Sequence, residues 1–276
     1  TASADAVVTA AEHGKGHEDV RWLLDQGFDG PIVDLSADFR YKDPALYEEW
    51  FDYTHPAPEL LDAFVYGLPE VNAPYPADTR LIANPGCFAT GLALTLRPIT
   101  QQLPEPRVTV TALTGASGSG ATPKSATHFP TREGNVRAYK IFNHQHLPEV
   151  LQAVGGTPEI GFVPVSGPWT RGIWGTVQVT LPDGVKANDV SAWYAQAYGE
   201  APFVRLWANE LPELRYAVET PYCDIGWVVD GSHMVAGFAI DNLLKGAASQ
   251  AVQNLNLLLD LPQSAGLKHV EATKKY

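Results

Sequence analysis

Cysteine is scarce in this sequence: Cys87 and Cys223 are its two cysteines among 276 residues. They lie far apart and neither belongs to a C-x-x-C pair, which argues against a zinc site built on thiolates, so we expect no bound metal. A disulfide between the two remains open. A reducing compartment is the simpler expectation, and we expect the protein in the cytoplasm.

Basic side chains are also scarce. The 19 Lys and Arg residues are outnumbered by 31 Asp and Glu residues, for a formal net charge of −12. An acidic protein binds nucleic acid and anionic membranes poorly, so we expect neither partner, and no apolar run is long enough to span a membrane. From Arg107 to Arg171, however, six basic residues stand against three acidic ones. That excess could attract a small anion, although chance clustering explains it equally well.

The first part of the chain has the pattern of a parallel α/β sheet. Buried-strand patterns alternate with helix patterns, and we expect Pro98 to stop the helix that starts at Cys87. The expected strands are 6–11, 31–35 and 81–83, and the expected helices are 18–24 and 87–96.

The middle of the chain has strand patterns without matching helices, which predicts an α+β domain with a mainly antiparallel sheet. These strands are expected at 108–112, 161–165, 173–180 and twice within 227–240. A final helix with Asp241 or Asn242 as its cap has apolar residues at helical spacing, and it is expected to pack on the first domain.

Cys87 is the strongest candidate for chemistry. Asn84-Pro85-Gly86 forms a tight turn that would deliver this Cys to the first turn of a helix. The helix dipole and the free N–H groups there favour a thiolate and could stabilise an oxyanion on a carbonyl under attack. A free Cys is more often a small buried residue, but the turn favours a nucleophile.

His144 and His146 are candidate bases for such a nucleophile. Two residues apart on an extended segment, they would face the same way and line one pocket. Surface or structural histidines are the ordinary alternative. A metal site is disfavoured because no carboxylate or thiolate set completes it.

Candidate anion-binding groups flank these histidines. The segment 114–124 carries three glycines and several hydroxyls, which suits close approach to an anion but equally suits a flexible turn. Arg137, Tyr139 and Arg171 are further candidates, since Arg recognises carboxylates and phosphates through paired hydrogen bonds. Solvated surface charge is the alternative for each Arg.

These segments together resemble the N-acyl-γ-glutamyl-phosphate reductases of arginine biosynthesis, and the resemblance covers nearly the whole chain. The matching segments are N-P-G-C-F-A-T at 84–90, S-G-S-G-A-T-P-K-S at 117–125, R-A-Y-K at 137–140, H-Q-H-L-P-E at 144–149, T-R-G-I-W-G-T-V at 170–177, D-N-L-L-K-G-A-A-S-Q-A-V-Q-N at 241–254, D-L-S-A-D-F-R at 34–40 and V-Y-G-L-P-E at 65–70.

The resemblance implies an NADPH-dependent reduction of a small acyl phosphate to an aldehyde through a thioester on Cys87. It implies His146 as the acid/base residue, with His144 as the alternative. The implied substrate ligands are Ser117, Arg137, Tyr139, His144 and Arg171, and the implied cofactor ligands are Asn242, Gly86 and Gly118. The expected N-acyl group is acetyl or succinyl. The alternative substrates are an aspartyl phosphate and a carrier-bound aminoadipyl phosphate. The alternative functions are a Cys/His hydrolase or acyltransferase and a non-catalytic pseudoenzyme.

The resemblance also implies a domain organisation. Residues 1–90 would form a Rossmann-type NADP-binding domain, completed by a C-terminal helix over 241–276, and residues 91–240 a catalytic and dimerisation domain. The glycine-rich phosphate-binding loop of that domain does not occur before Ala6, so we expect the chain to start part-way through it. Phe88-Ala89 stands where many members of the family have Tyr-Pro. A homotetramer or homodimer is expected.

Overall fold

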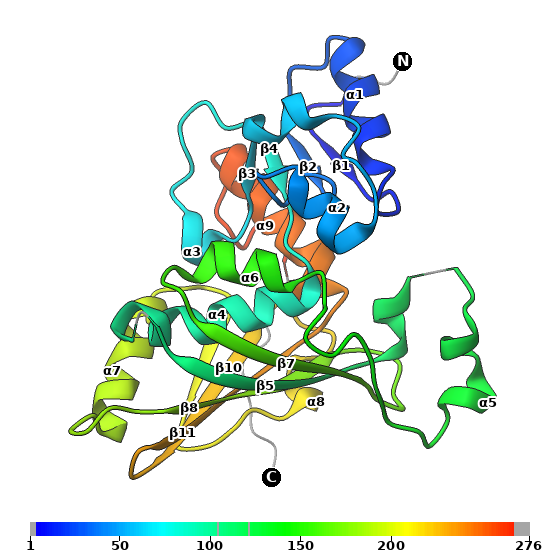
Figure 1. The fold of residues 1–276 in the computed structure, drawn as a ribbon. Helices are drawn as coiled ribbons and strands as arrows, with labels where there is room; N and C mark the ends of the chain where they lie inside the picture. Colours follow the sequence, from blue (N-terminus) through cyan, green and yellow to red (C-terminus); the bar gives the residue numbers. More distant parts are fainter. Residues whose placement is uncertain (1–3, 104, 121, 268–276) are drawn as a thin grey trace. The chain divides into compact units, whose positions relative to one another are not determined.

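The computed structural model describes residues 4–103, 105–120 and 122–267, which form two compact units. The first unit comprises the chain up to Gly86 together with Ala247–Leu267, and the second comprises Cys87–Gly246. Each unit combines helices with a β-sheet (Figure 1).

The first unit contains a four-stranded sheet in the order β1-β2-β4-β3, in which all neighbouring strands are parallel. The predicted parallel sheet is thereby confirmed. Its strands are β1 (Val7–Thr9), β2 (Ile32–Asp34), β3 (Phe64–Tyr66) and β4 (Leu81–Ala83). Its helical segments are α1 (Gly16–Asp25), α2 (Ala45–Phe51), η1 (Pro58–Ala63), α3 (Pro69–Asn72) and α9 (Ser249–Leu258).

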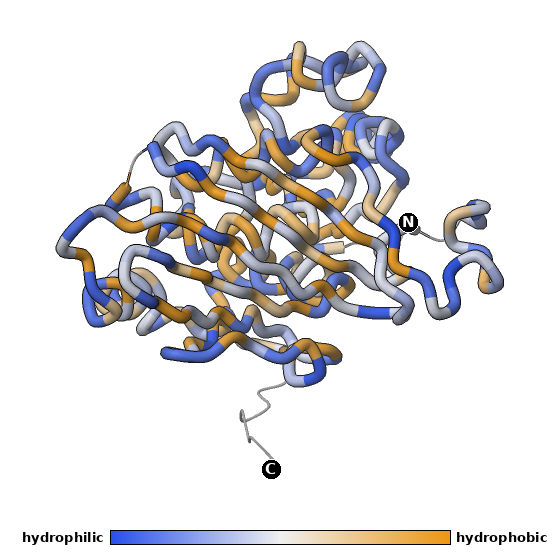
Figure 2. Tube along the Cα trace, turned by 60° about the horizontal axis from the view of Figure 1, so that its bottom comes forward, coloured by the Kyte–Doolittle hydropathy of each residue, from blue (hydrophilic) through white to orange (hydrophobic). Residues whose placement is uncertain are grey.

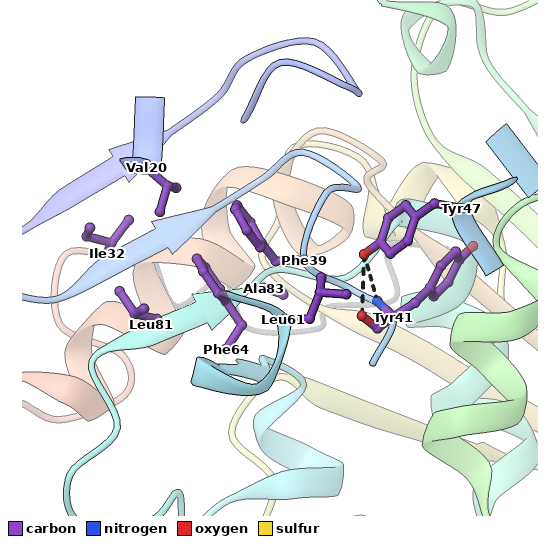
Figure 3. Packing of buried hydrophobic residues seen from close by; sticks show 9 residues of the cluster. All are labelled: Val20, Ile32, Phe39, Tyr41, Tyr47, Leu61, Phe64, Leu81 and Ala83. Carbon is purple, nitrogen blue, oxygen red and sulfur yellow. Dashed lines mark hydrogen bonds between the residues drawn. The ribbon is translucent and has the colours of Figure 1, made fainter. Parts of the chain in front are cut away.

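Aromatic packing closes one side of this sheet (Figure 3). The rings of Phe39 and Phe64 are stacked, with their centroids 3.9 Å apart. The Tyr47 hydroxyl accepts a hydrogen bond from the backbone N–H of Tyr41 at 3.1 Å. Because buried aromatic side chains contribute large apolar areas, this cluster gives a small unit much of its core.

The motif at 34–40 has a structural role in this unit. The buried Asp38 carboxylate accepts hydrogen bonds from the backbone N–H groups of Gly14 at 2.6 Å and His17 at 3.1 Å. The Arg40 guanidinium donates from Nε to the carbonyl of Asn84 at 2.8 Å. These bonds fix the loop after β1 and the turn that leads to Cys87.

The last helix differs from the expectation of one continuous helix over 241–276. Leu244–Ala248 form a π-helical turn, and α9 then runs from Ser249 to Leu258, while residues 268–276 lie outside the described part. The predicted cap is confirmed for Asp241, whose Oδ1 accepts the N–H of Leu243 at 2.9 Å. Asp241 also accepts at its carbonyl the N–H of Gly246, five residues on, and this bond produces the wider turn.

The polar side of α9 is buried as well as its apolar side. Ala251 packs against Val33 and Ile82 of the sheet. On the polar side, Asn254 donates to the carbonyl of Gly67 at 2.8 Å, and Asn256 donates to two carbonyls of the segment after the helix. Side-chain amides thus satisfy backbone groups that would otherwise be buried without partners.

The second unit contains a seven-stranded sheet in the order β6-β7-β5-β8-β11-β10-β9. Neighbouring strands are parallel in β5·β7 and β9·β10 and antiparallel in the other four pairs, so the predicted mainly antiparallel sheet is confirmed. The strands are β5 (Arg107–Thr114), β6 (Arg137–Ala138), β7 (Glu159–Ser166), β8 (Ile173–Thr180), β9 (Val204–Ala208), β10 (Cys223–Asp230) and β11 (His233–Ile240).

Helices cover one face of this sheet. The helix α4 (Cys87–Gln102) packs on β8 and β11 and is flanked by α6 (Leu147–Val154) and α7 (Ala187–Tyr198). Buried and more exposed residues alternate along β8, and Figure 2 shows hydrophobic and hydrophilic residues mixed along the strands. The shorter segments are η2 (Ala116–Ser119), η3 (Ser125–Thr127), α5 (Phe129–Arg132) and α8 (Leu214–Ala217). Among the described residues, the helices are too short or too polar to cross a membrane.

The prediction that Pro98 ends α4 is wrong, because the helix continues through it to Gln102. Proline lacks an N–H, so the carbonyl of Leu94 loses its usual helical donor. The hydroxyl of Tyr198 on α7 donates to that carbonyl at 2.8 Å. A neighbouring helix therefore supplies the missing hydrogen bond and tolerates the proline.

Candidate active site

Cys87 is the first residue of α4 in the second unit and is partly exposed. A sixteen-residue helix directs the positive end of its dipole at this position, which favours an anionic sulfur. Gly246 lies directly against it: a Cβ at position 246 would stand 2.8 Å from the Cβ of Cys87. The absence of a side chain at Gly246 therefore lets the π-helical turn approach the cysteine.

His144 and His146 lie together beside Phe88, the residue that follows Cys87. Their ring centroids are 4.7 Å apart, and that of His144 is 5.2 Å from the ring of Phe88. They belong to a turn rather than to the extended segment we expected, since Nδ1 of His144 accepts the backbone N–H of His146 at 3.2 Å and α6 starts directly afterwards. The two rings lie together, as predicted, but a turn and not an extended segment brings them together.

The surroundings of His144 keep its imidazole neutral. The ring is 3% exposed and makes edge contacts with Phe88, Tyr139 and Phe162. Burial, helped by the charge of His146, lowers the pKa of His144 to about 2. The neutral ring is consistent with its Nδ1 acting as an acceptor.

Tyr139 connects this histidine pair to the cysteine and to two arginines. Its ring lies 5.8 Å from that of His144. Burial raises the pKa of the Tyr139 phenol, a negative charge on Cys87 raises it further, and the guanidinium groups of Arg132 and Arg137 oppose the shift. The phenol therefore stays protonated and can donate a hydrogen bond.

Glu149 is a site residue that the sequence analysis did not single out. It is fully buried on α6, three residues after His146, and its carboxylate is 3.9 Å from Nε2 of that histidine. Residues three apart on a helix lie on the same side, so the segment H-Q-H-L-P-E contained the signal. A carboxylate at this distance can orient the His146 imidazole.

Ser117, Gly118 and Asn242 form a second cluster of predicted residues. The Asn242 amide donates to the Ser117 hydroxyl at 3.0 Å, and its oxygen accepts the N–H of Gly172 at 2.6 Å. A Cβ at Gly118 would lie 3.9 Å from the same amide. Within the described part of the chain, the second N–H of the Asn242 amide has no acceptor, so it can bind a ligand.

The remaining predicted residues differ in their environments. Arg171 pairs with the buried Asp241 at 2.7 Å while part of its side chain stays exposed, whereas Arg137 is exposed on β6. Gly86 belongs to the first unit. Arg132, which the sequence did not single out, is partly buried.

Comparison with known proteins identifies the family. Residues 1–78 match the model of the semialdehyde dehydrogenase NAD binding domain, and residues 87–242 match that of the semialdehyde dehydrogenase dimerisation domain. An N-acetyl-gamma-glutamyl-phosphate reductase from Dehalococcoides mccartyi (strain CBDB1) is 42% identical over 272 residues, which covers 96% of this chain and 79% of the relative. The chain belongs to the N-acetyl-gamma-glutamyl-phosphate reductase family. A reductase of the same name from Methanocaldococcus jannaschii is 36% identical over 95% of this chain and 77% of its own length.

Solved structures agree with this family at the level of the fold. The aspartate semialdehyde dehydrogenase II of Vibrio cholerae has a TM-score of 0.70 at 19% identity, over 92% of this chain and 79% of that one. The aspartate semialdehyde dehydrogenase of Candida albicans, solved with NADP, has a TM-score of 0.62 at 13% identity, over 93% and 77%. At these identities the likeness is one of fold.

Proposed function

We propose that this chain reduces N-acetyl-γ-glutamyl phosphate to N-acetylglutamate semialdehyde and phosphate with NADPH, as a step of arginine biosynthesis. The relatives of that name, at up to 42% identity over most of the chain, support the reaction. The observation that carries the proposal is Cys87 at the start of α4, with both histidines packed around the adjacent Phe88.

Cys87 would act as the nucleophile. Its thiolate attacks the acyl carbon, the bond from that carbon to the phosphoryl oxygen breaks, and inorganic phosphate leaves with the electron pair. The product is a thioester between Cys87 and the N-acetylglutamyl group. The N-terminal end of α4 supports both the thiolate and the oxyanion that forms on the carbonyl.

His146 is the better choice for the acid/base residue. The pKa of His144 is lowered to about 2, so its ring is neutral at neutral pH and does not act as an imidazolium acid. His146 lies beside it, and the buried Glu149 carboxylate, 3.9 Å from its Nε2, can orient the ring for proton transfer. His144 would instead orient the backbone of His146 and line the pocket with Tyr139.

The substrate carries two anionic groups, and the second unit offers donors for both. We assign Ser117 and Arg171 as one set of donors for an anionic group. The segments that carry these two residues are joined by a hydrogen bond, because the N–H of Ser117 donates to the carbonyl of Thr170 at 2.8 Å. Arg137 and Tyr139 form the other set, and the Arg137 guanidinium is close enough to oppose the rise in the pKa of the Tyr139 phenol. Arginine suits both anions because its guanidinium donates two parallel hydrogen bonds.

The residues also fit a dinucleotide cofactor. Asn242 has a spare amide N–H and lies beside Gly118, which has no side chain to obstruct an approaching ring. We propose Asn242, Gly118 and Gly86 as residues that bind NADPH. We also propose that the first unit is the larger part of the NADP-binding domain and that the second unit is the catalytic and dimerisation domain. NADPH supplies the hydride that reduces the thioester to the aldehyde.

The test of this function is a substrate comparison. The oxidation of NADPH would be followed by its absorbance at about 340 nm. N-acetylglutamyl, N-succinylglutamyl and aspartyl phosphates would be compared as substrates. We expect the highest kcat/KM with N-acetylglutamyl phosphate and none in Cys87→Ser. Preference for aspartyl phosphate, or phosphate release with no NADPH oxidation, would reject the proposal in favour of another reductase or of a hydrolase.

A homodimer or homotetramer is the proposed assembly. The dimerisation-domain match and the exposed Phe129 and Phe142 of the second unit support it, because large exposed apolar side chains often mark interfaces. Light scattering that gave the 29.9 kDa of a single chain would contradict it. A cytoplasmic location stays a prediction.

A further inference from the structure

Arg132, at the end of α5, is held at one edge of the seven-stranded sheet. Its Nη1 donates to the Ser166 hydroxyl, and its Nη2 donates to the carbonyls of Thr114 at 3.2 Å and Trp169 at 3.4 Å. Thr114 ends β5 and Ser166 ends β7, and the glycine-rich segment starts directly after Thr114. The guanidinium is therefore fixed where the anion-binding segments leave the sheet.

Its positive charge has no counter-charge in the described part of the chain. All three hydrogen bonds go to neutral oxygens, and Arg132 forms no ion pair with a described carboxylate. Its Nε is buried without an acceptor among the described residues. A buried donor without an acceptor destabilises the fold, so such a group calls for a compensating partner.

A second cation, Arg137, stands near Arg132 and adds to this imbalance. Burial and the charge of Arg137 both lower the pKa of the Arg132 guanidinium. The Tyr139 phenol is influenced by both arginines and by Cys87, so all four groups share one neighbourhood in the second unit. Two cations and a phenol donor beside a nucleophile form a site for an oxyanion.

We propose that Arg132 binds an oxyanion of the substrate beside Cys87, together with Arg137 and Tyr139. The anion is the phosphoryl group or the α-carboxylate, and this identity rests on the proposed function. Arg132 lies outside the segments that carry the family resemblance, so that resemblance assigns it no role. Its fixed orientation limits the entropy that binding an anion would cost.

The first test uses two alkylating agents of similar size, anionic iodoacetate and neutral iodoacetamide, with peptide mapping to follow Cys87. We expect Arg132→Met to lower the iodoacetate-to-iodoacetamide rate ratio roughly threefold to tenfold, as for one unit charge several ångströms away in a partly solvated site. Arg132→Lys should restore part of the ratio. Arg107→Gln, which removes an arginine whose side chain is 87% exposed, is the matched control and should leave the ratio unchanged.

The second test identifies the anion by protection of Cys87 from iodoacetamide. Inorganic phosphate mimics the phosphoryl group, and N-acetylglutamine carries only the α-carboxylate. If one of these two compounds protects Cys87 in the wild type and in Arg107→Gln but not in Arg132→Met, then Arg132 binds the anionic group of that compound. An unchanged alkylation ratio in a folded Arg132→Met, or protection equal to wild type by both probes, would overturn the proposal.

The two proposals fail separately. Alkylation and protection need neither acyl phosphate nor cofactor, so their outcome stands even if N-acetylglutamyl phosphate is not the substrate. If the substrate comparison fails while the charge preference at Cys87 holds, Arg132 still binds an oxyanion and only its source changes.

Discussion

His144 illustrates how a packed environment decides the role of one residue. Its imidazole is surrounded by aromatic rings and accepts a backbone N–H, and both features favour the neutral form. The sequence offered two equivalent histidines for acid/base work. The environment separates them, because the pKa of His144 is lowered to about 2 and a buried carboxylate lies near His146.

This lowered pKa predicts a pH-dependent stability. In the unfolded chain His144 takes up a proton near its ordinary pKa of 6.5, but in the folded chain only near 2. Between these values the unfolded state binds more protons, so the free energy of unfolding falls as the pH drops below 6.5, by about 1.4 kcal/mol per pH unit. We expect His144→Gln to flatten the decrease in melting temperature between pH 7 and pH 5, and the exposed His233→Gln to retain the wild-type decrease. An unaltered slope in His144→Gln would contradict the assignment.

Gly246 gives a prediction about access to the cysteine. An added Cβ would lie 2.8 Å from the Cβ of Cys87, closer than real Cβ atoms approach another atom, and a tight 3.2 Å from its Cα. We expect Gly246→Ala to cost about 1–3 kcal/mol of stability and to slow alkylation of Cys87 by iodoacetamide, measured by peptide mapping. Gly161→Ala, where the nearest atom would be 3.6 Å away, is the control. Equal alkylation rates in the two variants would argue against this close contact.

Some site residues could be predicted from the sequence and others could not. Cys87 was found because a turn before a helix pattern is a local signal, and the paired histidines because they are two residues apart. The bond between Ser117 and Asn242 joins residues 125 positions apart, so local pattern alone could not pair them. Arg132 was not singled out, because the oxygens that hold it lie on segments separate from it in sequence.

At the scale of elements, α4 shows how a neighbour can override a local signal. Proline usually ends a helix, yet α4 extends past Pro98 because Tyr198 of α7 donates to the carbonyl that proline leaves without a donor. Tyr194 on the same helix donates to the next carbonyl, that of Thr95, at 2.7 Å. In a continuous α-helix that carbonyl also accepts the N–H of Ile99, four residues on.

These two tyrosines form a matched pair for a test. Tyr198→Phe leaves a buried carbonyl without its donor, and we expect a loss of about 1–3 kcal/mol in the free energy of unfolding. Tyr194→Phe removes a bond to a carbonyl that still has a partner, so the expected loss is smaller, about 0.5–1.5 kcal/mol. Chemical denaturation of the two variants would measure the difference. A larger loss in Tyr194→Phe would contradict this account of the proline.

The alternation of strands and helices predicted most elements of both sheets, because strand and helix periodicities are local. The expected strand at 173–180 agrees with β8 residue for residue. The π-helical turn at Leu244–Ala248 and the buried amides of α9 were not predictable in the same way. Their causes are contacts with Cys87 and with loop carbonyls that are distant in sequence.

At the scale of the whole molecule, charge and site chemistry point in opposite directions. The chain carries a formal net charge of −12, yet the charges of Arg132, Arg137 and Cys87 all act on the partly buried Tyr139 phenol. A local cationic site within an acidic protein selects small anions and disfavours large polyanions such as nucleic acid. An acyl phosphate with a carboxylate fits that selection.

The central claim is that Cys87 takes the acyl group of N-acetylglutamyl phosphate. It is tested most directly by the intact mass of the chain after mixing with that compound, with and without NADP⁺, followed by peptide mapping. The account predicts one N-acetylglutamyl thioester on Cys87, present in Cys223→Ser and absent in Cys87→Ser. No adduct in the folded protein under either condition, or an adduct confined to another residue, would contradict it.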